Sequence, residues 1–208
     1  MSAPLGIRLP WSTGAAAWLE DARAAEEAGF AFVAVTGDPD PFTLLAAAAG
    51  ATRRIRLVAA VPSDVAEPYE LARRLASLDH LSGGRAGWLL SGAGTARARS
   101  LVAATGTLLE SWRGDEIVAS GGTFVSRPDP GRFQYRDPQF DIAGLFSTPP
   151  GPQRHPVLLG RLHAVAVTAA DDPAGIAARL GGPGDGVLLD PDGPVAAQVA
   201  LGVPALLP

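Results

Sequence analysis

The sequence of 208 residues contains no cysteine, no lysine and no asparagine. The absence of cysteine excludes disulfides, thiolate nucleophiles and zinc–thiolate sites. The absence of lysine excludes Schiff-base chemistry and the lysine of a P-loop, and the absence of asparagine leaves no acceptor for N-linked glycans. All 17 basic residues are therefore arginines, a usage typical of a GC-rich bacterial genome.

Long apolar runs and basic blocks are missing as well. No window reaches the roughly 18 to 20 uninterrupted apolar residues of a membrane span, and residues 1–14 lack the layout of a signal peptide. The net charge is −4 and the arginines are scattered, which disfavours nucleic acid as a partner. With 47% hydrophobic residues, we expect a soluble, cytoplasmic protein that forms one domain over residues 1–208.

Apolar runs alternate with helical patterns through the first 114 residues. Ser12 or Thr13 is the expected cap of the first helix, and prolines suit the first turn of the second. We expect strands at 6–10, 31–37, 55–63 and 85–92, and helices at 12–30, 38–54, 66–84 and 95–114.

The alternation breaks at residues 115–144, which we interpret as an irregular insertion with one or two short antiparallel strands. Parallel strands need crossover connections, so the pattern predicts an α/β fold with about seven parallel strands. Either an open doubly wound sheet or a barrel one strand short of eight would accommodate it. The later strands are expected at 155–162, 163–169 and 184–191, and the later helices at 171–181 and 193–208.

Two glycine pairs raise the question of a phosphate-binding loop. Gly83 and Gly84 follow the expected end of a helix, and Gly92 and Gly94 lie between a strand and the next helix. Neither pair has the spacing of a dinucleotide-binding motif or a P-loop, so we interpret both as turns. The alternative is that backbone N–H groups near Gly92 and Gly94 receive an anion.

Polar side chains follow several of the expected strands. Asp40 is a second carboxylate, after Asp38, in the segment that follows the expected strand at 31–37. Ligands of α/β proteins gather at the carboxyl ends of parallel strands. The alternative is that these are ordinary loop and cap residues. The side chains that could converge at this edge are those of Asp38, Ser63, Ser91 and Asp190.

The three histidines predict no metal site. His80 falls in the last turn of an expected helix, where a structural role suits an imidazole. His155 and His163 are too far apart to chelate as a local pair. No serine lies in a GxSxG elbow, which excludes that class of hydrolase.

The segment EPYELARRLASLDHLSGGRAGW, residues 67–88, strongly resembles the bacterial luciferase-like flavin monooxygenases, in the branch of the nitrilotriacetate, alkane and dibenzothiophene-sulfone monooxygenases. The resemblance implies a TIM-barrel-like fold, incomplete or compacted, and oxidation of a small organic substrate by reduced flavin. FMN or a deazaflavin would come from a partner reductase. The resemblance assigns no catalytic residue and no metal. It makes Asp38, Ser63, Ser91 and Gly92 the cofactor-binding residues.

Departures from the family pattern imply weak flavin binding. Leu89 stands where the family has an asparagine that contacts the flavin, and Ala60 stands where it has a threonine. The phosphate-holding loop after the fifth strand is replaced by a segment that contains Arg161. These losses open the alternative of a non-catalytic family member, a pseudoenzyme acting as a binding or partner subunit. It would form a homodimer or a heterodimer with a full-length relative.

A third hypothesis is a new small ligand in the emptied barrel. The insertion would then act as a lid, because its aromatic residues suit an apolar pocket, although core packing is their commoner use. These residues are Phe124, Phe133, Tyr135, Phe140 and Phe146.

Overall fold

The computed structural model of the chain divides into two compact units. The first consists of Met1–Ala60, Arg85–Leu89 and Val157–Pro208, and the second of Val61–Gly84 and Leu90–Pro156. The expectation of a single domain stays a prediction. The structure describes residues 5–11, 14–37, 39–92, 94–114, 117–120, 123–126, 129–159, 162–167 and 186–191.

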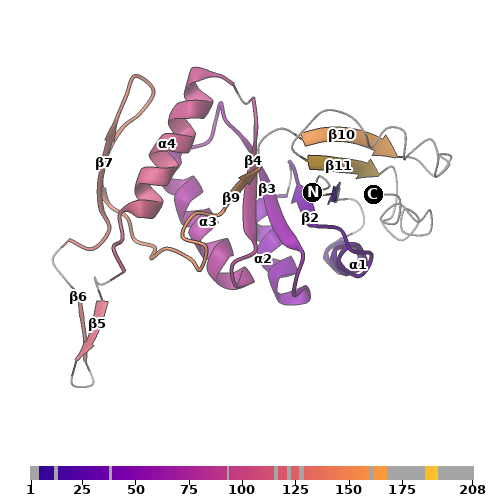
Figure 1. Ribbon diagram of the computed structural model, residues 1–208, viewed down its shortest axis with the longest axis horizontal. Coiled ribbons are helices and arrows are strands. Elements are labelled where there is room, and N and C mark those ends of the chain that lie inside the picture. Colours follow the sequence, from indigo (N-terminus) through magenta and orange to yellow (C-terminus); the bar gives the residue numbers. More distant parts are fainter. Residues whose placement is uncertain are drawn as a thin grey trace. The chain divides into compact units, whose positions relative to one another are not determined.

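Most of a seven-stranded sheet belongs to the first unit (Figure 1). Its strands are, in spatial order, β10 (Leu162–Val167), β11 (Gly186–Pro191), β1 (Leu5–Arg8), β2 (Phe32–Val35), β3 (Arg56–Pro62), β4 (Ala86–Ser91) and β9 (Val157–Leu159). Five of the neighbouring strand pairs are parallel by their residue register. The backbone hydrogen bonds between β3 and β4 show that these two strands also run in the same direction. The expected seven parallel strands are confirmed.

The two edge strands of this sheet indicate a barrel-like fold. β9 and β10 are the edge strands, yet only residues 160 and 161 separate them in the chain. Three residues of extended chain span at most about 11 Å, so the sheet curls until these two strand ends approach each other. Counted from β1, the described strands follow the order of an eight-stranded α/β barrel with one position unfilled. This confirms the expectation of an α/β, barrel-like but incomplete fold.

Two helices cover β2 in the first unit. α1 (Ala15–Glu27) and α2 (Pro41–Ala51) pack against β2 and against each other (Figure 1). The N-cap of α1 is Gly14 with φ of 93°, which corrects the expected cap by a serine or threonine, because glycine enters this backbone region without strain. α2 begins as predicted: Pro41 lies in the first turn, and the carboxylate of Asp40 accepts the N–H of Thr43 at 3.1 Å.

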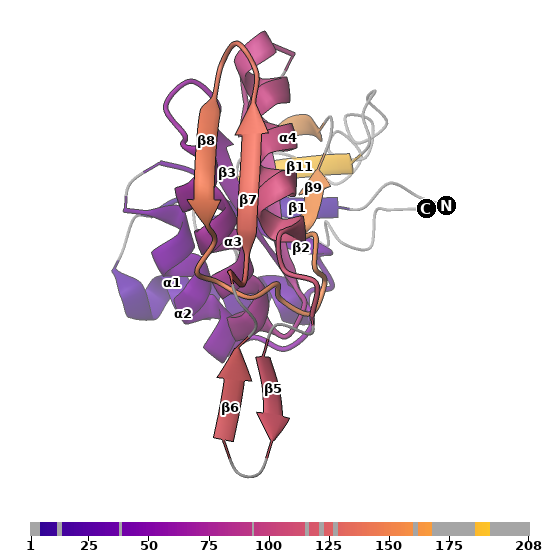
Figure 2. The same ribbon diagram turned by 90° about the vertical axis from the view of Figure 1, so that its left-hand side faces the viewer.

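Two helices and two hairpins make up the second unit. α3 (Pro68–Ser82) packs against α4 (Ala96–Glu110). β7 (Arg132–Arg136) runs along α4 and pairs with β8 (Asp141–Leu145), as Figure 2 shows. β5 (Ile117–Ser120) pairs with β6 (Thr123–Ser126) in a second antiparallel hairpin. The described part of the insertion therefore contains four short antiparallel strands, where one or two were expected.

Aromatic side chains of the insertion build the core of the second unit. Phe133 and Phe146 are 8% and 1% exposed and pack with Trp112. The indole N–H of Trp112 donates to the carbonyl of Phe146 at 2.8 Å, and the ring of Tyr69 meets Phe146 edge-on at 5.5 Å. These aromatics act as core residues, the commoner use of such side chains, while the Phe124 side chain lies outside the described residues.

The helices expected at 171–181 and 193–208 lie outside the described residues. Within the part that is described, no helix has both the length and the apolar character needed to cross a bilayer.

Candidate functional site

The carboxyl ends of β3 and β4 meet in the second unit. The N–H of Ser63 donates to the carbonyl of Ser91 at 3.2 Å, and the Ser63 hydroxyl donates to the carbonyl of Gly92 at 3.4 Å. The Ser91 hydroxyl donates to the carbonyl of Val61, also at 3.4 Å. Three of the four residues expected at the site are thus neighbours. We call Ser63, Ser91 and Gly92 the serine rim.

Both hydroxyls of the serine rim are lightly engaged. A distance of 3.4 Å is long for a bond between a hydroxyl and a carbonyl oxygen. Each hydroxyl oxygen also keeps lone pairs that can accept a bond. Ser91 is exposed, whereas Ser63 is 3% exposed. Ser91 therefore presents the more accessible hydroxyl to a ligand. Ser63 holds the neighbouring backbone in place through its hydrogen bonds.

Gly92 is required by the geometry of the rim. Its φ is 74°, and a Cβ at this position would lie 2.9 Å from the Ser63 hydroxyl oxygen. Glycine therefore permits both the turn and the close approach. α4 begins soon after, where Thr95 accepts the N–H of Ala98 at 3.0 Å. The chain thus brings the start of a helix close to the rim, a place where N–H groups favour anions.

Gly83 and Gly84 end α3, as interpreted from the sequence. Gly83 takes the left-handed conformation as C-cap, with φ of 64°. The N–H groups of the two glycines donate to the carbonyls of His80 and Asp79. These glycines turn the chain.

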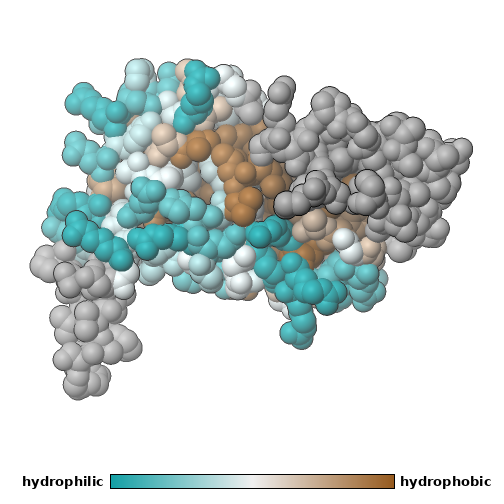
Figure 3. Space-filling model, viewed as in Figure 1, coloured by the Kyte–Doolittle hydropathy of each residue, from teal (hydrophilic) through white to brown (hydrophobic). Residues whose placement is uncertain are grey.

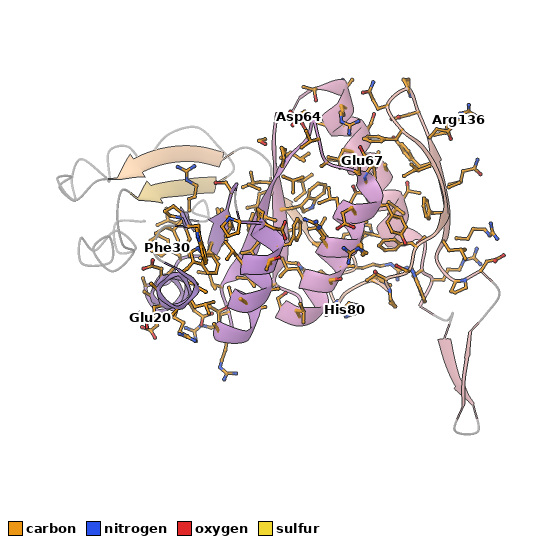
Figure 4. All side chains as sticks on the ribbon, turned by 180° about the vertical axis from the view of Figure 1, so that it is seen from behind. Glu20, Phe30, Asp64, Glu67, His80 and Arg136 are labelled. Atoms are coloured by element: carbon orange, nitrogen blue, oxygen red, sulfur yellow. The ribbon has the colours of Figure 1, made fainter. Side chains whose placement is uncertain are left out.

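Sequence reasoning missed a cation beside the rim. The Nε of Arg97 donates to the carbonyl of Ser63 at 3.1 Å, and its Nη2 donates at 3.0 Å to the carbonyl of Ala66 and to a carboxylate oxygen of Glu67. Figure 4 shows Glu67 at the end of α3 opposite His80. A cation in the first turn of a helix is unfavourable for the helix dipole, and that anomaly was the available signal.

Of the other expected site residues, Asp40 and Asp190 belong to the first unit. Asp38 lies outside the described residues, so its predicted role stays a prediction. Asp40 caps α2, which is the loop-and-cap alternative. Asp190 pairs with Ala166 in the backbone register of β11 and β10. Ala60 is half-buried within β3.

One face of the sheet in the first unit is apolar. Phe32 and Val58 are buried there, and the half-buried Leu89 and Leu159 pack against them. Gly6 pairs with Phe32, and a Cβ at Gly6 would lie 2.1 Å from the phenyl ring. Figure 3 shows apolar surface where β4 and β9 lie in Figure 1. Leu89 thus belongs to an apolar cluster, where it offers a ligand no hydrogen bond.

The serine rim and the start of α4 offer groups that can bond to a flavin. A hydroxyl and the N–H groups at a helix start can bond to the polar ring edge or to the phosphate. Arg97 is already bonded to two carbonyls and to Glu67, so a phosphate would rely on backbone N–H groups. These contacts fit a loosely held flavin.

His80 and His155 make structural contacts. The Nε2 of His80 lies 3.1 Å from the carbonyl of Pro149, which confirms a structural role with a different partner from the helix carbonyls. The Nε2 of His155 lies 3.4 Å from a carboxylate oxygen of Glu110 on the surface. Across the described ranges, no group of three or more His, Asp or Glu side chains could hold a metal ion.

Comparison with known proteins agrees with this fold. The family model of the luciferase-like monooxygenases matches residues 8–170. One subunit of the pristinamycin IIA synthase of Streptomyces pristinaespiralis is 35% identical over an alignment of 187 positions, and the match covers 81% of this chain and 67% of that protein. Nitrilotriacetate monooxygenase component A of Aminobacter aminovorans is 55% identical over 49 residues, which are 24% of this chain and 11% of that protein.

A solved structure extends the likeness to three dimensions. A riboflavin lyase, crystallised with modified FMN and its substrate riboflavin, matches with a TM-score of 0.66 at 21% identity. The match covers 86% of this chain and 57% of that chain. At this identity the likeness concerns the fold. The chain spans about two thirds, or less, of each of these three proteins.

Proposed function

Because the chain belongs to the luciferase-like monooxygenase family, we propose that it is a flavin-dependent monooxygenase homologue that oxidises a small organic substrate with reduced flavin. The observation that carries the proposal is the serine rim at the carboxyl ends of β3 and β4. Ligands of barrel folds bind at this edge of the sheet.

The cofactor is FMN or a deazaflavin, delivered in reduced form by a partner reductase. The riboflavin lyase of similar fold was crystallised with modified FMN, which supports a flavin as the ligand class. When bound, reduced flavin supplies the two electrons with which a monooxygenase reduces dioxygen, placing one oxygen atom in the substrate and the other in water. The protein supplies binding, orientation and the exclusion of competing reactions.

Each residue of the serine rim has a distinct role in flavin binding. The exposed hydroxyl of Ser91 bonds to the polar edge of the flavin. The buried Ser63 holds the ends of β3 and β4 together through its N–H and hydroxyl. Gly92 permits the close approach and leads the chain toward α4, whose N–H groups donate to the phosphate.

A second function is favoured by Leu89. This residue packs with Phe32 and Val58 where the family pattern implies an amide, so flavin binding loses a hydrogen bond there. The relative from Streptomyces pristinaespiralis is itself one subunit of a synthase. The second candidate is therefore a non-catalytic partner subunit, in a homodimer or in a heterodimer with a longer family member that holds the flavin.

Flavin titration and measurement of molar mass separate these functions. We expect the full chain to quench and shift flavin fluorescence with saturation below about 1 mM, which corresponds to about 4 kcal/mol or more of binding free energy. Light scattering after size-exclusion chromatography, alone and with a longer family member of the same organism, tests the subunit role. A stable complex without flavin binding by this chain favours the second candidate, and a monomer that binds flavin favours the first.

A further inference from the structure

One arginine connects three segments around the serine rim. The side chain of Arg97 leaves the first turn of α4 and reaches the loop of residues 63–67, where it bonds to two carbonyls and to Glu67. Its guanidinium carbon lies 4.6 Å from the ring centroid of Phe140, in the turn between β7 and β8. α4, the 63–67 loop and the β7–β8 turn therefore share one side chain.

The position of Arg97 is poor for the helix that carries it. The first turn of α4 has no acidic residue, and a cation there faces the positive end of the helix dipole. The side chain is 27% exposed and is directed to the loop acceptors. The positive charge of Arg97 thus stabilises the 63–67 loop.

The bonds of Arg97 also require the shape of a guanidinium. Its acceptors are the carbonyl of Ser63, the carbonyl of Ala66 and the carboxylate of Glu67, which is the N-cap residue of α3. A planar fork with five N–H donors reaches several acceptors at once and stacks on an aromatic ring, whereas an ammonium acts as a point charge. An arginine therefore fits this place better than a lysine.

The β7–β8 turn that covers Arg97 is itself held firmly. The carboxylate of Asp137 accepts the N–H groups of Gln139 and Phe140 at 2.7 and 2.8 Å and the hydroxyl of Tyr135 at 2.7 Å. The hydroxyl of Ser100, followed by these groups, lowers the pKa of Asp137 to about 2. The carboxylate is therefore charged at neutral pH, and Phe140 stays placed over the guanidinium.

We propose that Arg97 is a positioning residue for the serine rim, which fixes the 63–67 loop under the β7–β8 turn and thereby sets flavin affinity. The inference rests on the proposed function. Arg97 is expected to act through Ser63, because its donors are directed to the protein and away from a ligand.

The test compares Arg97→Gln and Arg97→Lys with the control Arg132→Gln. Arg132 lies in the same unit, and its ion pair with Asp129 is exposed and does not touch the rim. We expect amide exchange of residues 63–67 in the full chain, without flavin, to accelerate about tenfold or more in Arg97→Gln. The dissociation constant for reduced FMN should rise by a similar factor. Arg97→Lys should recover part of both effects, and the control should match wild type.

Other results would overturn the proposal. Exchange in the 63–67 loop and flavin affinity that match the control show that Arg97 positions nothing. Faster exchange with no flavin binding by any variant, wild type included, overturns the proposed function and with it the flavin role of Arg97. If Arg97→Gln does not fold, Glu67→Ala removes one of its partners at a side chain that is 64% exposed. This variant should show the same two effects at reduced size, and wild-type behaviour would contradict the proposal.

Discussion

The two ends of β4 are built differently. At the amino end, the guanidinium of Arg85 donates to the carbonyls of Ala49, Thr52 and Ile55 and to the Thr52 hydroxyl, over 2.9–3.2 Å. At the carboxyl end, the hydroxyls of Ser63 and Ser91 make bonds of 3.4 Å. One end is fully bonded to the protein, and the other retains bonding capacity at an exposed residue.

This difference separates stability from function along one strand. Charge-assisted bonds to several carbonyls are strong and leave no capacity for a ligand. Long hydroxyl bonds are weak, so a ligand can replace or supplement them at small cost. The same division holds in barrel enzymes, where the carboxyl end of the strands carries the chemistry and the amino end the stability. Variants at the two ends should therefore change different quantities.

The largest effect is expected for Arg85→Gln. The substitution leaves the carbonyls at the end of α2 without their charged donor, and we expect the free energy of unfolding to fall by about 2–4 kcal/mol. Urea denaturation followed by circular dichroism measures it. Arg85→Lys keeps the charge without the fork and should lose less. A loss of unfolding free energy as small as that of Arg132→Gln would contradict the larger contribution to stability assigned to the amino end of β4.

Leu89→Asn should strengthen flavin binding and lower the free energy of unfolding. The amide restores the donor and acceptor that the family resemblance implies, so we expect flavin to bind about tenfold more tightly, or about 1.4 kcal/mol. An amide inside the cluster of Phe32, Val58 and Leu159 should also lower the free energy of unfolding by about 1–3 kcal/mol. Leu89→Met is the apolar control. Equal flavin affinity in the two variants would contradict the role assigned to this position.

Ser91→Ala should weaken flavin binding while leaving stability nearly intact. The hydroxyl is exposed and its protein bond is long, so we expect the free energy of unfolding to change by less than about 1 kcal/mol. The dissociation constant for reduced flavin should rise by about three- to tenfold. Thermal melts and fluorescence titration measure the two quantities. An unchanged dissociation constant would remove Ser91 from the proposed site.

The smallest effect is expected from pH at Glu26, which binds the backbone just before β3. Burial raises the pKa of Glu26, but N–H groups of Ile55, Arg54 and Arg53 lower it more, so the net shift is downward from 4.5. A lowered folded pKa stabilises the protein above the unfolded pKa, and this contribution is lost as pH falls through the folded pKa. The stability difference between wild type and Glu26→Gln should thus be larger at neutral pH than at about pH 3. A difference that does not change with pH would contradict this assignment.

Local patterns predicted the framework of the molecule and little of the bonding within it. The alternation of apolar runs and helical periods located the strands, and Gly83 marked the end of α3, because these signals reside in neighbouring residues. The serine rim followed from a rule about strand ends. The hydrogen bonds of Arg97, Arg85 and Glu26 reach partners 27–36 residues away, a separation at which no local periodicity operates.

Binding of reduced flavin to the full chain tests the central claim most directly. The measurement is an anaerobic titration with reduced FMN and a reduced deazaflavin, with Ser91→Ala alongside. We predict saturable binding below about 1 mM that weakens in the variant. Absence of binding by wild type at that concentration, for reduced FMN and the reduced deazaflavin alike, would contradict the assignment of a flavin site to the serine rim.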